Sequence, residues 1–384
     1  MSILCVGSVA LDSVQTPFGS AERVLGGSAV FFSAAATIFC PVQIVGVVGT
    51  DYPLDRLEFL VERGADLEGI EQEEGESFFW AGRYRYDLTF RDTLETRLGV
   101  FADFRPRIPE AFRDARQVFL GNIDPVLQHE VLDQVSSPEV VACDTMDYWI
   151  EGSRKELLSL LERVDILLVN DGEARQLADE PNLLKASRWI RERGPRIVVV
   201  KKGEHGAILF ADDWVFFAPG YPLEVVFDPT GAGDAFAGGF MAHLARSDDL
   251  SPPNMRRAMV YGAAMGSFAG EAFGMQGFER VTGADVDAEY RRLAASSALR
   301  SASPNSRTVA ASSRLRVASS SSIGVVSASM APSCAMAAYW PRPARAISCH
   351  TGVVVVIPPH WIVLTAMCCL RAATTESANG TSCA

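Results

Sequence analysis

The sequence lacks the short motifs that identify several large groups of α/β enzymes. It has no Gly-x-x-x-x-Gly-Lys-Ser/Thr segment and no Gly-x-Gly-x-x-Gly segment that opens a helix after the first expected strand. Their absence disfavours the two commonest modes of nucleotide binding on such folds. A Gly-x-Ser-x-Gly nucleophile elbow is also missing, which argues against an α/β hydrolase.

Positive charge is scarce as well. The chain has 35 Lys and Arg against 47 Asp and Glu, a formal net charge of −12, which argues against nucleic acid or an anionic membrane as the main partner. No paired Cys/His spacing indicates zinc, and Cys5, Cys40 and Cys143 stand apart in apolar surroundings typical of core positions. The N-terminus lacks the basic and long apolar regions of a signal peptide, so we expect a cytoplasmic protein.

The composition changes abruptly after residue 296. Residues 297–384 contain no Asp, no Lys, one Glu and five of the eight cysteines, and they carry about +6 where residues 1–296 carry about −18. We therefore expect one folded domain in residues 1–296 and a Ser/Ala/Cys-rich tail that is disordered or translated out of frame. An apolar stretch at 353–370 is interrupted by Pro-Pro-His, which disfavours a membrane anchor.

Short apolar runs alternate with amphipathic segments throughout the first 296 residues. The runs are continuous rather than alternating, as in parallel strands that are covered on both faces. They lie at residues 3–9, 42–49, 117–122, 139–144, 165–170 and 196–203. Helical patterns at 153–164 and 180–194 separate the later runs. This order predicts an α/β fold with a doubly wound, mostly parallel sheet and helices on both faces, with ligands at the carboxyl ends of the strands.

Residues 77–101 break this rhythm. Aromatic and polar side chains alternate from Phe79 to Tyr86, a period of two that predicts antiparallel strands. We expect these strands, with others in residues 12–25, to form a small lid apart from the main sheet. Lid strands of this kind leave open a homodimer in which they pair between subunits.

The segment FDPTGAGDAFAGGF, residues 227–240, predicts a strand, a tight turn and a helix that begins at about Gly233 or Asp234. The free N–H groups of a helix N-terminus attract anions, and Gly231, Ala232 and Gly233 are small enough to let a phosphate touch them. Asp234 follows directly. It is either an ordinary helix-capping acid or a general base that takes a proton from an attacking hydroxyl.

Small residues continue into the expected helix. Gly238 and Gly239 each cost about 1 kcal/mol of helix propensity relative to Ala. A close neighbour, either a strand or bound nucleotide, would account for this composition.

With these residues, the chain resembles the ribokinase-like, or PfkB, carbohydrate kinases over roughly residues 1–295. DPTGAGD is similar to the family signature, with Pro229 where Thr usually stands. The resemblance implies an ATP-dependent kinase in which Gly231, Ala232 and Gly233 form an anion hole and Asp234 is the base. It also implies that Thr230 belongs to the nucleotide site.

The N-terminal segments GSVALD and VLGGSAVFFSAAA resemble the family's sugar-binding region. Asp12 would bind two vicinal hydroxyls, and Gly26 and Gly27 would let the ring approach the backbone. The alternative is a plain turn with a solvated Asp12. VGTD at 48–51 resembles a turn near the substrate, so Asp51 is expected either to bind substrate or to cap a helix.

Two further segments match the nucleotide side of the family. VNDGE at 169–173 carries the Asn-x-x-Glu pattern through Asn170 and Glu173, which in the family organises Mg²⁺ and phosphate, often through water. The same spacing is close to a helix capping box, and the two roles are compatible because Mg²⁺ keeps most of its waters.

KKGEHG at 201–206 fits the family turn through Lys201, Gly203 and Gly206, which would shape the ATP site. A bare hairpin turn is the alternative for this segment. Asp144, at an expected strand end, could also face the cleft.

The sequence thus predicts a kinase that transfers the γ-phosphate of ATP, with Mg²⁺, to a hydroxyl of a sugar or nucleoside. The rival hypothesis is a catalytically silent ligand-binding or regulatory protein of the same fold. A damaged anion hole or a missing base would mark that rival, and neither is seen in the sequence.

Overall fold

The computed structural model describes residues 1–296, 347–348 and 354–355. The chain divides into two compact units, Met1–Arg307 and Thr308–Ala384. In the second unit, β14 (Ile347–Ser348) and β15 (Val354–Val355) pair in antiparallel fashion. The expectations for the tail and for its apolar stretch otherwise lie outside the described residues. No helix among the residues that the structure describes is long and apolar enough to cross a membrane.

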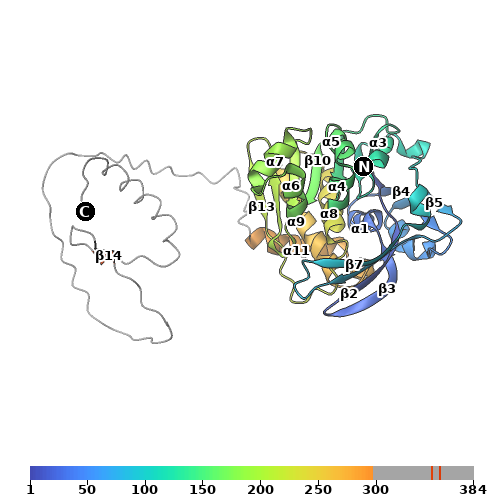
Figure 1. Ribbon diagram of the computed structural model, residues 1–384, viewed down its shortest axis with the longest axis horizontal. Coiled ribbons are helices and arrows are strands. Elements are labelled where there is room, and N and C mark those ends of the chain that lie inside the picture. The colour runs from blue at the N-terminus through green and yellow to red at the C-terminus, as the bar shows by residue number, and fades with distance from the viewer. Residues whose placement is uncertain (297–346, 349–353, 356–384) are drawn as a thin grey trace, which may run out of the picture. The chain divides into compact units, whose positions relative to one another are not determined.

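A nine-stranded sheet forms the centre of the first unit (Figure 1). Its strands lie in the order β13-β12-β11-β10-β9-β8-β1-β4-β5. Their bounds are β1 Ile3–Val6, β4 Val42–Gly49, β5 Ala65–Glu73, β8 Gln117–Leu120, β9 Val140–Asp144, β10 Ile166–Asn170, β11 Ile197–Lys201, β12 Ala207–Phe210 and β13 Val215–Ala218. Neighbours from β11 to β5 are parallel, whereas β12 and β13 are antiparallel additions at one edge. The six apolar runs are all confirmed as parallel strands.

Helices cover both faces of this sheet, so two apolar cores form, one on each side. On one face lie α1 Ser28–Ala36, α2 Glu58–Glu62, α8 Ala232–Ser247, α9 Pro252–Gly270, α10 Gln276–Arg280 and α11 Gly283–Ser296. On the other lie α3 Pro125–Leu132, α4 Asp147–Gly152, α5 Arg154–Leu161, α6 Asp171–Ala178 and α7 Leu183–Arg191. Because strands between two helical layers bury both sets of side chains, all four residues of β1 are buried.

Helix α8 is packed between α1 and α9 at very short range. A Cβ at Gly238 would lie 2.3 Å from the Phe32 carbonyl oxygen of α1, and one at Gly239 would lie 2.5 Å from Met265 of α9. The close neighbours predicted from these small residues are therefore two helices rather than a strand. The close packing holds the N-terminus of α8 in a fixed place relative to the sheet.

A second, four-stranded sheet stands apart from the first, as predicted for the lid (Figure 1). Its strand order is β3-β2-β6-β7. Their bounds are β2 Ala10–Thr16, β3 Gly19–Gly26, β6 Phe78–Tyr84 and β7 Arg91–Arg97. Both predicted lid segments are confirmed, with the difference that β2 and β6 pair in parallel fashion while the outer pairs are antiparallel.

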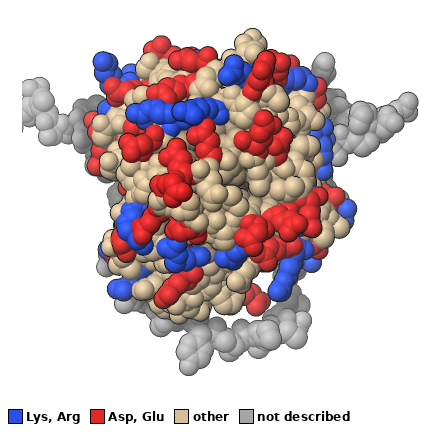
Figure 2. Space-filling model, turned by 90° about the vertical axis from the view of Figure 1, so that its right-hand side faces the viewer, with Lys and Arg blue, Asp and Glu red and all other residues tan. Residues whose placement is uncertain are grey.

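Figure 2 shows the face on the right of Figure 1. Across the described residues on this face, groups of acidic side chains alternate with basic ones, and no continuous basic band is seen. This distribution agrees with the acidic balance of the chain.

The structure corrects the strand expected before the Gly-Ala-Gly-Asp turn, because residues 219–231 form no strand. Hydrogen bonds to α9 and to the lid fix this segment in place of strand pairing. The Phe227 N–H donates to the Gly270 carbonyl at the end of α9, and the Phe227 carbonyl accepts from the Thr16 hydroxyl of the lid at 2.8 Å. The sequence pattern also missed β5, whose alternate exposed polar residues are those of a sheet edge.

The order of the strands in the main sheet predicts where a ligand crevice lies. From β1 the chain builds outward through β4 and β5 on one side, and through β8 to β11 on the other. Ligands of open α/β sheets bind beyond the carboxyl ends of the strands near such a reversal. Asp144, Asn170 and Lys201 are the last residues of the neighbouring strands β9, β10 and β11, so they end at the same edge.

Candidate active site

The N-terminus of α8 supplies a free backbone donor at this edge. Gly231 precedes the helix with φ 73°, a left-handed conformation that favours glycine, and a Cβ there would lie 2.2 Å from the Phe31 ring. The helix begins at Ala232, slightly earlier than expected. Ala232 donates to the Pro229 carbonyl at 3.3 Å, whereas the Gly233 N–H has no acceptor within residues 1–296. This geometry suits an anion.

Asp234 lies in the first turn of α8, beside that donor. Burial and the neighbouring Asp144 raise the pKa of Asp234 to about 7, against the opposing effect of Lys201 and Arg91. A carboxyl that exchanges its proton near neutral pH is well matched to general-base catalysis. Its place in the first turn is equally that of a capping acid, so both interpretations share one geometry.

Lys201 and Asp144 form a buried ion pair next to this turn. Lys201 Nζ lies 2.6 Å from Asp144 Oδ2, with side chains only 15% and 6% exposed. The same ammonium would lie 3.0 Å from a Cβ at Gly233, so it stands against the backbone where the anion would bind. Burial opposes the charged form of Lys201, but the surrounding carboxylates, Asp144 first, outweigh it and raise the pKa.

Asn170 and Glu173 form the reciprocal capping box that was one of the two expected roles. The Asn170 side chain accepts from the Glu173 N–H at 2.8 Å, and Glu173 Oε2 accepts from the Asn170 N–H at 2.7 Å. Burial and the nearby Asp144 raise the pKa of Glu173 to about 7. The Oε1 atom is left over for a water or another polar group in this arrangement.

The fit to Mg²⁺ can be judged from the same acids. Within the described part of the chain, no group of three His, Cys, Asp or Glu side chains is placed to hold a metal ion. The described side chains therefore do not form a complete set of protein ligands for Mg²⁺. Mg²⁺ usually keeps several waters and uses one or two carboxylates plus substrate phosphates, and Glu173, whose charge acts on Lys201, fits that mode.

The turn after β11 has the geometry of a hairpin that leads into β12. Gly203 and Gly206 both take positive φ, 54° and 83°, and the Lys202 N–H donates to the Gly206 carbonyl at 2.8 Å. His205 is exposed. The bare-hairpin alternative therefore describes the fold of this turn, and its position at the carboxyl end of β11 keeps it next to Lys201.

Asp12 points into the other half of the site from lid strand β2. Burial and the acids Asp228 and Asp234 raise the pKa of Asp12 to about 7, so it is a buried carboxyl rather than a solvated turn residue. A Cβ at Gly26 would lie 2.0 Å from the Asp12 carboxylate, and one at Gly27 would lie 2.4 Å from the Ser8 carbonyl. These glycines make room for Asp12 and for the entry into α1.

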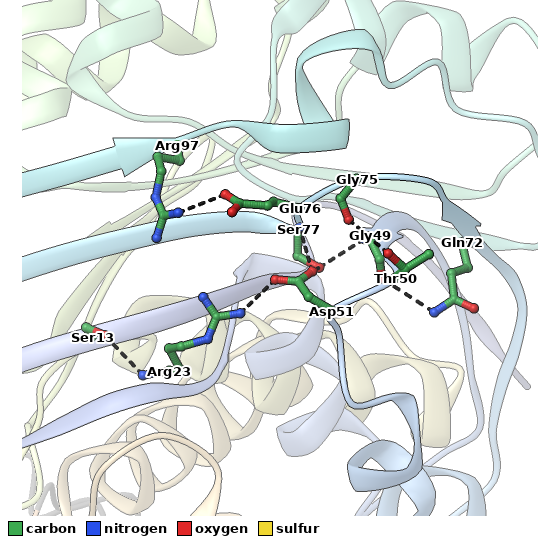
Figure 3. A network of polar contacts seen from close by, with 10 residues as sticks. All are labelled: Ser13, Arg23, Gly49, Thr50, Asp51, Gln72, Gly75, Glu76, Ser77 and Arg97. Carbon is green, nitrogen blue, oxygen red and sulfur yellow. Dashed lines mark hydrogen bonds and ion pairs between the residues drawn. The ribbon is translucent and has the colours of Figure 1, made fainter.

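Asp51 does not present a free carboxylate (Figure 3). Its Oδ1 accepts from the Ser77 N–H at 2.8 Å and the Ser77 hydroxyl at 2.7 Å, and its Oδ2 accepts from Arg23 at 2.7 Å. The next helical turn, at Leu54–Leu57, has no side-chain cap. Asp51 therefore joins the lid to the main sheet and does not cap that turn, and its binding of substrate stays a prediction.

Tyr84, Arg91 and Asp228 lie where the lid meets the turn before α8; the sequence reasoning missed Asp228 and Arg91 and considered Tyr84 only as a ring that could stack on a substrate. Thr230 donates its N–H to Asp228 Oδ1 at 2.9 Å, and its hydroxyl lies 3.2 Å from the Tyr84 hydroxyl of β6. Tyr84 pairs in register with Arg91 of β7, whose charge opposes, without outweighing, the rise in the pKa of both Asp12 and Asp234. Asp228 is the first acid of the DPTGAGD segment, and this position could have indicated a role at the site. No pattern in the sequence predicts that Asp228 lies near Tyr84 and Arg91.

The chain is similar in sequence to known kinases. Residues 130–278 match the family described as pfkB family carbohydrate kinase. A nucleoside kinase of Methanothermobacter thermautotrophicus is 31% identical over 304 residues, 71% of this chain and 91% of that protein. A cytidine kinase of Thermococcus kodakarensis is 28% identical over 255 residues, 65% of this chain and 91% of that protein.

The fold also matches a solved structure of an Escherichia coli protein designated ribokinase II, in complex with ATP and Mg²⁺. Its TM-score is 0.63 at 20% identity, and the match covers 76% of this chain and 99% of that one. A nine-stranded sheet, a separate lid and a GAGD helix N-terminus define a ribokinase-like kinase. The chain belongs to the PfkB carbohydrate kinase family, and it is a carbohydrate or nucleoside kinase of this ATP-dependent family.

Proposed function

We propose that this kinase transfers the γ-phosphate of ATP to a hydroxyl of a nucleoside or a sugar, with Asp234 as the general base. One observation carries the proposal: a partly buried carboxyl with a pKa raised to about 7 stands in the first turn of α8, beside a backbone N–H without an acceptor in residues 1–296. A base and an anion-binding donor are the two groups that phosphoryl transfer to an alcohol requires.

In this proposal the backbone of Gly231, Ala232 and Gly233 is the anion hole. The N–H groups of a helix N-terminus are already oriented, so they stabilise charge on the transferring phosphoryl group without reorganisation. Lys201 adds a positive charge beside the same backbone, and Asp144 fixes its ammonium at 2.6 Å. Asp234 removes the proton of the acceptor hydroxyl as the new bond to the γ-phosphorus forms and the bond from that phosphorus to the bridging oxygen breaks, which releases ADP.

ATP would lie from the α8 N-terminus toward the Gly203–Gly206 turn, with Thr230 beside its phosphates. Asn170 and Glu173 would hold Mg²⁺ through water. When bound, the ion neutralises negative charge on the phosphates. The residues of this chain orient the water and the phosphates around it, because the capping box fixes Glu173 at the start of α6.

The acceptor would lie under the lid, with its hydroxyls on Asp12 and its ring near Gly26 and Gly27. Several relatives support a nucleoside, since two of them are a nucleoside kinase and a cytidine kinase, whereas the family model covers carbohydrate kinases. A closed lid would exclude water and so limit wasteful ATP hydrolysis.

A homodimer through the lid is part of the proposal. Strand β7 is an outer strand of the lid, and six of its seven residues are exposed. An exposed edge strand is a template for pairing with another chain. Light scattering of the purified protein would show twice the monomer mass if the lid pairs in this way, and a monomer would refute it.

The experiment that tests the activity measures ADP release with Mg²⁺ over a panel of nucleosides, pentoses and hexoses. We expect release to depend on one group of acceptors. Silence over the whole panel, together with tight ATP binding measured by calorimetry, would overturn the proposal in favour of the silent ligand-binding protein.

A further inference from the structure

The junction between the lid and the main sheet contains a dense polar network (Figure 3). Asp51 follows β4 of the main sheet, and Ser77 comes just before lid strand β6. Besides the two hydrogen bonds from Ser77 to Asp51, the Ser77 hydroxyl accepts from the Gly49 N–H at 2.9 Å. One carboxylate oxygen, Oδ1, therefore connects the end of β4 with the start of β6.

This part of the junction has little freedom to move. The Thr50 N–H donates to the Gly75 carbonyl at 3.1 Å, and a Cβ at Gly49 would lie 2.3 Å from that carbonyl oxygen. On the far side, the Val100 N–H donates to the Glu76 carbonyl at 2.9 Å. Backbones packed at this range form a fixed base for the lid.

The second oxygen of Asp51 reaches a different lid strand. Its Oδ2 lies 2.7 Å from Arg23 Nη2 of β3, and the two side chains are 47% and 30% exposed. This contact joins two long or solvent-facing side chains rather than packed backbones. It is the part of the network that can open without disturbing the core.

Arg23 occupies a strained position next to the acceptor site. Its φ is 47°, which is uncommon for a residue with a side chain, and its N–H donates to the Ser13 hydroxyl at 3.0 Å. The pairing of β2 with β3 shifts register between Asp12 and Val14. Arg23 therefore lies, with Glu22, in a bulge of β3 opposite Ser13, the residue that follows Asp12, and bulges re-aim neighbouring side chains.

We infer that Arg23 and Asp51 are positioning residues for the acceptor: their ion pair fixes the bulge opposite Ser13 and so holds the Asp12 carboxylate where it binds substrate hydroxyls. The inference rests on the proposed acceptor role of Asp12. It assigns Asp51 an action through Arg23 rather than contact with substrate. An exposed ion pair of this kind contributes little to stability, so loss of the pair changes the geometry of the site more than the fold.

The test compares Arg23→Gln, Arg23→Lys and Asp51→Asn with a control in the same lid. Arg85→Gln is the control, because Arg85 and Asp92 form an ion pair of the same length, 2.7 Å, away from the junction. We expect Arg23→Gln and Asp51→Asn to raise the acceptor KM by ~10-fold, since sub-ångström misplacement of a binding group is costly. The ATP KM should stay near that of the native enzyme, Arg23→Lys should recover part of the loss, and Arg85→Gln should match the native enzyme.

The double variant identifies whether the two residues act as one unit. If the pair is the active feature, Arg23→Gln combined with Asp51→Asn raises the acceptor KM no further than either change alone. If Arg23 instead binds substrate directly, Asp51→Asn leaves the acceptor KM unchanged and the inference is overturned. Equal losses for the acceptor, for ATP and in Tm would also overturn it, because they indicate damage to the fold.

Hydrogen exchange of the free protein provides a readout that does not depend on kinase activity. We expect amides of residues 19–26 to exchange faster in Arg23→Gln than in the native chain and in Arg85→Gln. If the native protein phosphorylates no acceptor and this difference is still seen, the proposed function fails while the ion pair keeps its positioning role in the lid. If the native protein is active and exchange is unchanged, the positioning role alone is wrong.

Discussion

The two halves of the active site are built in opposite ways. The phosphate half consists of strand ends and a helix N-terminus within the main core, where Gly238 admits the backbone of α1 at a range that no side chain would allow. The acceptor half includes a small lid whose outer strand, β7, is almost wholly exposed. One of the contacts that attach this lid to the main sheet is the solvent-facing ion pair between Arg23 and Asp51.

This difference indicates how one site can hold the reacting groups in fixed positions and still admit and enclose an acceptor. Transition-state stabilisation depends on groups that are fixed before the reaction, and in our proposal these groups belong to the phosphate half. Entry of substrate and exclusion of water need a part that moves, and in our proposal this part is the lid. Substitutions in the first half should therefore lower kcat, whereas substitutions in the second should act mainly on the acceptor KM.

The largest effect is expected at the base. Asp234→Asn removes the proton acceptor while keeping nearly the same volume, so kcat should fall by ~10²–10⁴-fold, the usual contribution of general-base catalysis. The Kd for ATP, measured by calorimetry, should change little. Full activity in this variant would show that Asp234 is only a helix-capping acid.

Loss of the buried ammonium should have the next largest effect. Lys201→Met removes the charge that stands against Gly233, and we expect kcat to fall by ~10²-fold, as for the loss of one preorganised donor. Lys201 also opposes the rise in the Asp234 pKa. The acid limb of the kcat/KM profile, expected near pH 7 in the native enzyme, should therefore move to higher pH in the variant.

Lys185→Met is the matched control for this experiment. Lys185 lies on α7 with a side chain that is 68% exposed, so its replacement should leave the rate and the pH profile unchanged. If Lys201→Met retains the native pH profile while its rate falls, the ammonium does not act on Asp234.

The rigid half and the strands of the lid were largely predictable from sequence, whereas the contacts that attach the lid were not. Continuous apolar runs predict covered parallel strands because burial on both faces leaves no other pattern, and small residues before Asp234 predict a helix N-terminus open to an anion. Asp51 was selected from the sequence as a candidate site residue, but its contact with Arg23 was not predicted. Its contact with Arg23 joins residues 28 apart in sequence across two sheets, and no local pattern records such a contact.

The close packing of α8 should produce a moderate effect on stability. Gly238→Ala places a methyl group 2.3 Å from the Phe32 carbonyl oxygen, so α8 or α1 must shift, at a cost of about 1–3 kcal/mol for overpacking. Gly152→Ala is the control, since a Cβ there meets nothing within 4 Å. Urea unfolding should show a loss for Gly238→Ala only, and equal midpoints would contradict the close approach.

The smallest expected effect is on the free energy of unfolding, which the ionised Asp234 carboxyl lowers above pH 7. Burial raises the pKa of Asp234 from 3.8 to about 7, so the native state binds more protons than the unfolded chain between these two values. The stabilisation from this group is complete below about pH 4 and is lost as the pH rises through 7. Asp234→Asn, which cannot ionise, should therefore be more stable than the native protein at pH 8, by on the order of 1 kcal/mol or a Tm about 2 °C higher. At pH 3, below both pKa values, the difference should nearly vanish, and a scan of Tm against pH for both proteins would reveal it; parallel curves would show that the Asp234 carboxyl is not desolvated in the native state.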